Sequence, residues 1–104
     1  MRNKINEIIK KINEKEIRSI TVESNHNYNT IPINDENRNK LNISTRIGDF
    51  DDEWFFQIKY ENFNLILLDI REIEEINVEN VLDDLEIRIQ DTEGNDEIKI
   101  EIEY

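Results

Sequence analysis

The chain has 104 residues and a formal charge of −12, and apolar and charged residue types each make up 37 % of it. This length supports a single domain, residues 1–104, built around one hydrophobic core. Its 20 Ile, 6 Leu and 3 Val bury enough area to drive folding, which excludes wholesale disorder. There is no cysteine and no apolar run long enough to span a membrane, which excludes disulfides, thiolate chemistry and membrane insertion. We expect a cytoplasmic protein.

Isoleucines near the start of the chain follow the spacing of one helical face, at i, i+3, i+4 and i+7. The four are Ile5, Ile8, Ile9 and Ile12. We therefore expect a helix over residues 3–15, with Asn3 as its N-cap. Lysines lie near its C-terminal end, where the helix dipole favours positive charge.

The patterning then changes from helical to extended. Residues 17–23 are rich in β-branched types, which indicates a strand. Residues 24–39 contain six Asn and few apolar side chains, which predicts a long loop with a short extended piece at residues 30–33. Alternation of apolar and polar residues resumes over 41–47 and predicts a half-buried strand.

An acidic turn at residues 49–53 separates this strand from a predicted hairpin. The hairpin strands are residues 54–60 and 63–70, joined by the two-residue connection Glu61-Asn62. The run Leu65–Leu68 is apolar on both faces, so we expect its strand at the centre of the sheet.

The last third of the chain contains one ambiguous segment and one clear hairpin. Residues 71–76 fit either a strand or a helix, and Asn77 is a suitable cap for a short helix over residues 77–85. Residues 86–91 and 96–104 form the clearest hairpin, because the isoleucines of both segments fall on one face. Short connections favour antiparallel pairing. The sequence thus predicts an α+β fold, with the N-terminal helix packed on an antiparallel sheet of about five to six strands and a short second helix near 77–85.

The charge is divided unevenly along the chain. Residues 1–47 carry +3 and residues 48–104 carry −15. Such a field repels nucleic acid and anionic membranes, so we expect direct binding to neither. It attracts a basic protein, and nucleic-acid-binding proteins are the commonest basic proteins in a cell. Acidity also keeps a small protein in solution, and this simpler explanation stays open.

Signatures of catalysis are missing from the sequence. His26 is the only histidine, and no serine has the flanking residues of a nucleophile elbow. Two glycines cannot form a phosphate-binding loop, and the acidic turn lacks the ligand spacing of a calcium loop. Glu97 and Lys99 match the E-x-K pattern of metal-dependent nucleases, whose substrate this acidic chain would repel. We expect no enzymatic activity, no metal site and no cofactor.

The acidic residues of the C-terminal half are the candidate partner-binding residues. Glu97, Glu101 and Glu103 share the hairpin face opposite the isoleucines, where successive side chains lie about 7 Å apart. To a partner whose groove is lined with Lys and Arg, such rows of carboxylates resemble a phosphate backbone. The full candidate set is Asp49, Asp51, Asp52, Glu53, Asp83, Asp84, Glu86, Asp91, Glu93, Asp96, Glu97, Glu101 and Glu103.

Residues 5–25, INEIIKKINEKEIRSITVESN, resemble the opening helix and first strand of small acidic anti-CRISPR proteins, which phages encode to inhibit Cas9. The likeness extends to size, acidity, lack of cysteine and a helix-first α+β order. It covers about a fifth of the chain and carries no functional residue over. The resemblance implies an inhibitor that prevents target DNA from entering a basic CRISPR effector.

The leading hypothesis is a non-enzymatic inhibitor that acts in a bacterial host cell and binds a basic nucleic-acid-handling protein through a nucleic-acid-mimicking acidic surface. One alternative is an immunity protein or antitoxin that neutralises a basic toxin such as a nuclease. Another is a small structural or assembly protein whose acidity is incidental. In that case Trp54, Phe55 and Phe56 would form an exposed apolar patch for self-association. The sequence leaves monomer and dimer open.

Overall fold

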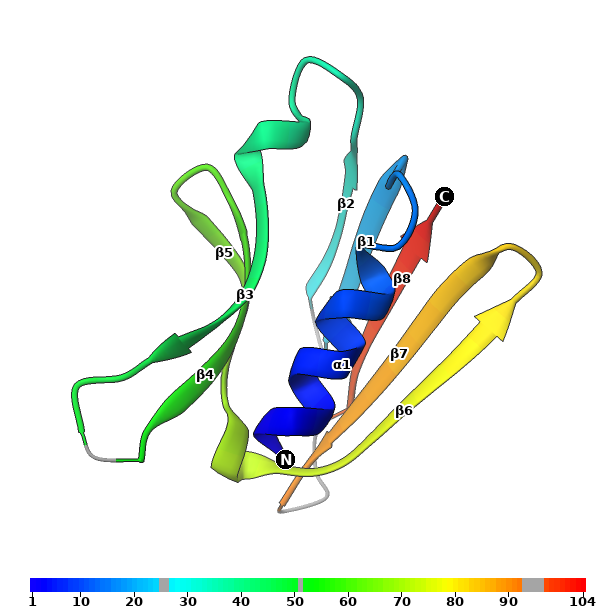
Figure 1. Ribbon diagram of the computed structural model, residues 1–104. Helices are drawn as coiled ribbons and strands as arrows, with labels where there is room; N and C mark the ends of the chain where they lie inside the picture. The colour runs from blue at the N-terminus through cyan, green and yellow to red at the C-terminus, as the bar shows by residue number, and fades with distance from the viewer. Residues whose placement is uncertain (25–26, 51, 93–96) are drawn as a thin grey trace.

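One helix and two antiparallel β-sheets enclose the core in the computed structural model, which describes residues 1–24, 27–50, 52–92 and 97–104 (Figure 1). The large sheet has the strand order β2-β1-β8-β7-β6 and the small sheet the order β3-β4-β5. The elements in chain order are α1 (Arg2–Ile12), β1 (Ser19–Ser24), β2 (Asn27–Pro32), the 3₁₀ helix η1 (Arg38–Lys40), β3 (Leu41–Ile47), β4 (Trp54–Tyr60), β5 (Phe63–Asp69), the 3₁₀ helix η2 (Ile70–Glu72), β6 (Ile73–Val81), β7 (Asp84–Asp91) and β8 (Glu97–Glu103).

The α+β class is confirmed, and the predicted single sheet of five to six strands is wrong. The described residues form eight strands in two sheets that face each other. One of the additional strands is β2, which pairs with β1 over its whole length and lies within residues 24–39, where only a short extended piece at residues 30–33 was predicted. Its Asn-rich composition hides the strand, because β2 is an edge strand whose side chains are nearly all exposed.

The N-terminal helix is confirmed, with slightly different ends. It begins one residue before Asn3, and its N-cap position is Met1, which makes no side-chain capping bond. It ends at Ile12, where the Asn13 side-chain amide donates to the carbonyl of Ile9 at 3.0 Å. Ile5, Ile8 and Ile12 are buried, as the helical spacing predicts.

The inward face of the large sheet is a layer of isoleucine. The closing hairpin is confirmed, with Ile87 opposite Ile100 and Ile89 opposite Ile98. On the other side of β8, Ile20 of β1 stands opposite Ile102. These pairs place apolar side chains of three adjacent strands on one face, which packs toward the small sheet and α1.

The small sheet contributes Phe56, Ile58 and Ile66 to the same core. The predicted hairpin between β4 and β5 is confirmed, but β5 is an edge strand and not a central one. Its apolar run is divided between the two faces, so Leu67 stays 42 % exposed while Ile66 is buried. The predicted exposed cluster of Trp54, Phe55 and Phe56 is also wrong, because Phe56 is fully buried and the other two are half-buried.

The predicted second helix over residues 77–85 is wrong, because this segment is the end of β6, a turn and the start of β7. Val78, Val81 and Leu85 stand at i, i+3 and i+7, a spacing that also fits a helix. The backbone instead pairs β6 with β7 from Ile73 to Val81, and Ile76 and Val78 turn toward the core. Tertiary pairing therefore overrides a local helical pattern.

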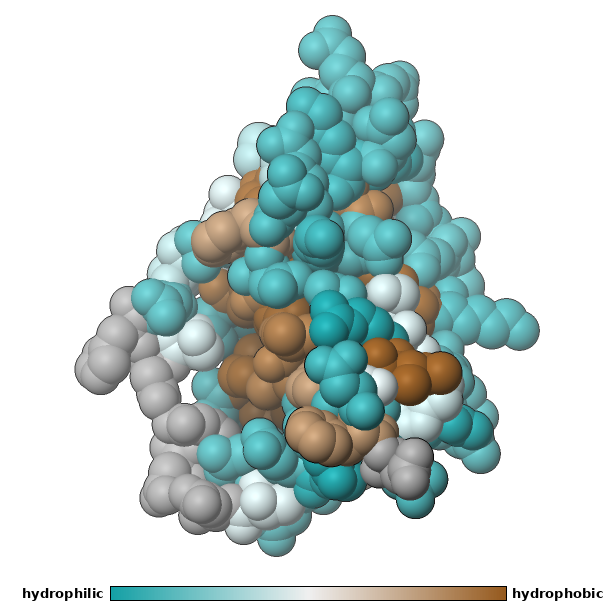
Figure 2. Space-filling view, turned by 90° about the vertical axis from the view of Figure 1, so that its left-hand side faces the viewer, coloured by the Kyte–Doolittle hydropathy of each residue, from teal (hydrophilic) through white to brown (hydrophobic). Residues whose placement is uncertain are grey.

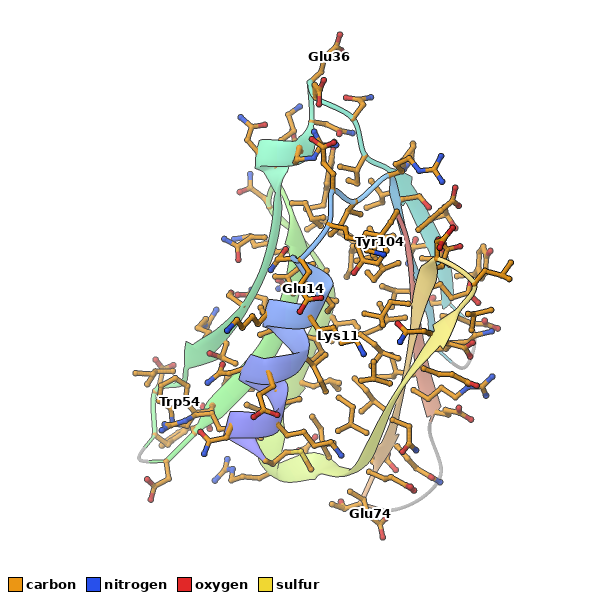
Figure 3. The ribbon with its side chains drawn as sticks, turned by 45° about the vertical axis from the view of Figure 1, so that its right-hand side comes forward. Lys11, Glu14, Glu36, Trp54, Glu74 and Tyr104 are labelled. Carbon is orange, nitrogen blue, oxygen red and sulfur yellow. The ribbon has the colours of Figure 1, made fainter. Side chains whose placement is uncertain are left out.

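Helix α1 lies at the opening between the two sheets (Figures 1 and 3). The C-terminal residue Tyr104 holds its end in place, because the phenol donates a hydrogen bond to the carbonyl of Ile12 at 2.7 Å. Lys15 lies over the Tyr104 ring at 5.6 Å from its centroid. Burial, followed by the negative charges of Glu14 and Asp84, raises the pKa of the Tyr104 phenol.

We expect Tyr104→Phe to lower the free energy of unfolding by about 1 kcal/mol at neutral pH, since it removes this hydrogen bond. The pKa of the Tyr104 phenol in the folded state lies above the ordinary value near 10, so the stability advantage of the wild type over Tyr104→Phe is complete below that pH. It falls as the pH rises through the folded-state pKa, because the phenolate cannot donate. Urea unfolding between pH 7 and 11 measures this difference. Tyr28→Phe, at a 67 % exposed position, is the control and should show no such dependence.

Three of the hairpin connections contain a residue with left-handed backbone angles: Asp52 at φ 61°, Glu61 at φ 52° and Leu82 at φ 57°. Left-handed geometry costs an L-residue about 1–2 kcal/mol, and glycine avoids this cost. Leu82 is 96 % exposed and contributes no packing to offset it. We expect Leu82→Gly to raise the free energy of unfolding by about 0.5–1 kcal/mol in urea titrations. Leu82→Ala keeps the Cβ atom and should gain nothing; an equal gain for both variants would contradict this explanation.

Candidate functional site

The outward face of the large sheet carries rows of carboxylates. Because side chains alternate along a strand, the inward isoleucines of β7 and β8 place their acidic neighbours on the opposite face. The strand register sets Glu101 of β8 opposite Glu86 of β7, and Glu86 opposite Glu79 of β6. Adjacent strands lie about 4.8 Å apart, so three carboxylates form one row across the sheet.

Charge is strongly divided between the elements. The five strands of the large sheet contain ten Asp or Glu and two Lys or Arg, a formal charge of −8. The three strands of the small sheet contain one acidic and two basic residues, +1, and α1 carries +3. The two sheets lie on opposite sides of the molecule (Figure 1), so the strands on one side are strongly acidic and those on the other nearly neutral, although the turn between β3 and β4 adds acidic residues to the small sheet.

Two cations on the strands lie among these carboxylates, Arg88 on β7 and Lys99 directly opposite it on β8, and Arg18, just before β1, pairs with Glu103. Arg88 contacts Glu86 at 2.7 Å and Glu97 at 3.2 Å, and Lys99 contacts Glu101 at 2.8 Å. The hydrogen bond that Arg88 donates to Glu86 raises the pKa of Arg88, and the one that Lys99 donates to Glu101 raises the pKa of Lys99. Both cations therefore stay charged and reduce the repulsion within the carboxylate rows without cancelling it.

A hollow of about 200 Å³ opens on the same sheet where β1, β8 and β7 lie side by side. Four carboxylates line it, and the hydroxyls of Ser19 and Thr21 lie on the β1 side; the four are Asp84, Glu86, Glu101 and Glu103. No lysine or arginine of the described residues is part of this lining. The hollow has the charge and the oxygen atoms to receive a guanidinium or ammonium group.

The structure brings together only part of the predicted set. Five of its members lie on the large-sheet strands at outward positions, Asp84, Glu86, Glu97, Glu101 and Glu103. Asp91 instead follows the inward side of β7 and lines a hollow beside Ile89 and Ile98. Asp83 lies in the β6–β7 turn, next to the end of α1.

The acidic turn between β3 and β4 belongs to the small sheet and is separate from these residues. Asp49 and Asp52 are exposed there, and Glu53 is largely buried beside Arg71, 3.5 Å from its guanidinium. Three predicted members, Asp51, Glu93 and Asp96, lie outside the described residues. The residues predicted as one site therefore occupy at least two places in the fold.

Sequence reasoning missed Glu23, Glu75 and Glu79, which complete the acidic face. Glu23 of β1 stands opposite Lys99, and Glu75 of β6 stands opposite Gln90. None of the three forms an ion pair with a lysine or arginine of the described residues. The alternation of Ile76 and Val78 could have placed Glu79 on the outward face, but this segment also fits a helix. For Glu23, nothing in the sequence shows that β1 pairs with β8.

No group of three or more His, Asp or Glu among the described residues is arranged to hold a metal ion. Within the same residues, no helix has both the length and the apolar character needed to cross a bilayer. Comparison of the chain with protein-family models, with curated proteins and with solved structures finds no match.

We expect Arg88→Gln to lower the melting temperature at low ionic strength, because Glu86 and Glu97 lose the cation between them. The loss should shrink in about 1 M NaCl, where repulsion between the remaining carboxylates is screened. Arg18→Gln is the matched control, because its pair with Glu103 is longer, 3.5 Å, and more exposed. Thermal unfolding by circular dichroism checks this, and a loss independent of salt would show that Arg88 acts through packing alone.

Proposed function

We propose that this chain is a non-enzymatic inhibitor that binds a basic, nucleic-acid-handling protein and shuts nucleic acid out of its binding groove. The proposed contact is the outward face of the large sheet. The observation that carries the proposal is the register that aligns Glu79, Glu86 and Glu101 across three strands, beside a hollow lined only by acidic, hydroxyl and apolar residues.

Like charges placed directly opposite each other on neighbouring strands destabilise a sheet. The fold itself does not require them, since the core lies on the opposite face. Uncharged residues occupy equivalent outward positions elsewhere: Thr21 and Thr30 stand opposite each other in the same row and share a hydrogen bond at 3.0 Å. Binding to a basic partner supplies a reason for carboxylates at the other three positions of this row, Glu79, Glu86 and Glu101.

The mechanism is occlusion assisted by electrostatic steering. Carboxylates about 4.8 Å apart across the strands and about 7 Å apart along them present a regular array of negative charge. A groove lined with Lys and Arg attracts this array before contact, which speeds association. On contact, a basic side chain of the partner enters the carboxylate-lined hollow, and the sheet then covers the surface that nucleic acid would occupy.

The specific inhibitor that we propose is encoded by a phage, acts in the cytoplasm of a bacterial host and binds a Cas9-type effector. The resemblance of residues 5–25 to anti-CRISPR proteins and the acidic face both support it. The described part of this segment, residues 5–24, covers most of α1, the loop after it and β1, so the segment that resembles the family holds one of the five strands behind the proposed contact.

The test measures DNA binding by a guide-loaded Cas9-type effector. We expect the chain to displace a labelled target duplex, as followed by fluorescence anisotropy, and to do so less well as the NaCl concentration rises from about 0.05 to 0.5 M. The double variant Glu79→Lys/Glu101→Lys should inhibit at least tenfold more weakly. Inhibition that does not depend on salt would contradict the proposed contact.

The control for the charge reversal is Glu7→Lys/Glu36→Lys. Both of its positions are exposed, on α1 and in the segment before η1, and the net charge of the two double variants is the same (Figure 3 labels Glu36). We expect this control to inhibit like the wild type. If both variants fail equally, net charge and not the large-sheet face determines binding.

A further inference from the structure

Strand β2 lies at one end of the large sheet, and its free edge carries backbone groups that point away from the sheet. Ile33 donates its amide to the carbonyl of Arg18 at 2.8 Å, and this pair continues the register of β1 with β2. Because the backbone groups of an antiparallel strand point to alternate sides, every second residue of β2 bonds to β1. Counted from Ile33, the amides and carbonyls of Tyr28 and Thr30 point away from β1, where no described strand pairs with β2.

Pro32 marks the point where this free edge ends. It occupies the next position that points away from β1, where a residue without an N–H group costs the sheet no hydrogen bond. Its carbonyl accepts a hydrogen bond from the side-chain amide of Asn37 at 2.8 Å. The segment that follows β2 forms the top of the molecule, and the surface there is hydrophilic (Figures 1 and 2). The free edge within β2 therefore consists of the amides and carbonyls of Tyr28 and Thr30.

The other edge strands of the two sheets are protected in ways that β2 is not. Strand β6 carries three glutamates, and β5 pairs with β4 through an irregular register. Helix α1 lies beside β3, where Thr45 donates to the Asn6 side chain at 3.3 Å. Charge, irregular pairing and a covering helix are common protections against the addition of a further strand. Strand β2 has no charged residue and a regular register with β1, so it is the edge to which an extended segment adds most readily.

Charge favours a basic segment of another protein as the added strand. The side chains of Tyr28 and Thr30 lie on the outward face of the large sheet, where Tyr28 stands opposite Glu23 of β1. Tyr28 is 67 % exposed, and Glu23 has no lysine or arginine partner among the described residues. A lysine or arginine placed opposite Tyr28 on an added strand can contact the ring and extend across it toward Glu23. A second copy fits poorly, because pairing two β2 edges joins two sheets whose strands each carry −8.

We propose that an extended, basic segment of the partner pairs antiparallel with β2 and becomes the sixth strand of the large sheet. Tyr28 and Thr30 each donate one backbone hydrogen bond to this segment and accept one from it. Lysine or arginine at alternate positions of the segment extends the outward rows of side chains and faces the acidic sheet. The inference rests on the proposed function, because the segment belongs to the same basic protein. It adds a requirement for an extended backbone that charge attraction alone does not impose.

Backbone amide hydrogen exchange of the isotope-labelled chain tests the pairing. The probe is a peptide of alternating lysine and valine with blocked ends, added at up to about 1 mM. We expect it to slow exchange at Tyr28 and Thr30 about tenfold, the protection that a hydrogen bond of about 1.4 kcal/mol gives. The control peptide is methylated at the backbone nitrogens of its lysines, which keeps the charge and removes the donors. Equal binding of the two peptides, no binding of the first, or unchanged exchange at Tyr28 and Thr30 would overturn the proposal.

Two variants at one position carry the test to the inhibitor itself. Thr30→Pro and Thr30→Val both lose the hydroxyl that shares a hydrogen bond with Thr21 at 3.0 Å, but only proline removes the outward amide. Neither changes a carboxylate. We expect Thr30→Pro to inhibit a Cas9-type effector about tenfold more weakly than Thr30→Val, with both circular dichroism spectra like that of the wild type. Equal inhibition by the two variants would overturn the pairing and leave the proposed function standing. If the wild type does not inhibit, the proposed function is wrong, and the exchange measurement still decides whether β2 accepts a strand.

Discussion

Burial of isoleucine between the two sheets is the constraint on which the rest of this structure depends. With no alanine and only two glycines, the chain has few small residues for close approach of backbones, so it fills its core with branched side chains. Ile87, Ile100 and Ile102 of the large sheet are fully buried, as are Ile5 and Ile12 of the helix. Because a strand alternates its side chains, each buried isoleucine of β7 and β8 fixes which neighbours face solvent.

This constraint acts on both sheets, yet their outward faces differ. On the large sheet the outward positions carry Glu79, Glu86 and Glu101, with Arg88 and Lys99 reducing their mutual repulsion. On the small sheet they carry asparagine, serine, glutamine, apolar residues and the cations Arg46 and Lys59, with a single aspartate among the three strands. Burial of the core decides that these residues face outward; it does not decide that they are charged.

The predictable part of the fold is the part in which local pattern and tertiary pairing agree. The closing hairpin was predictable because apolar and polar side chains alternate over residues 84–90 of β7 and along the whole of β8. The strand and turn over residues 77–85 were not predictable, because Val78, Val81 and Leu85 also have the spacing of one helical face. Only the register with β7 excludes a helix there. The sequence predicts that the site consists of acidic residues, but it does not predict which acidic residues lie together. Strand order, which sequence does not contain, separates Asp49 and Asp52 from Glu101 and adds Glu23 to its sheet.

The division of charge argues against solubility as the whole explanation of the acidity. A chain that needs negative charge only to stay in solution can place it on any exposed strand position, and both sheets offer such positions. Here ten of the eleven acidic strand residues lie on the large sheet, where Glu86 and Glu101 stand directly opposite each other at a cost in repulsion. The small sheet, free of that repulsion, keeps exposed Leu67 and Phe63 instead. Two sheets that share one core thus present different chemistry to solvent.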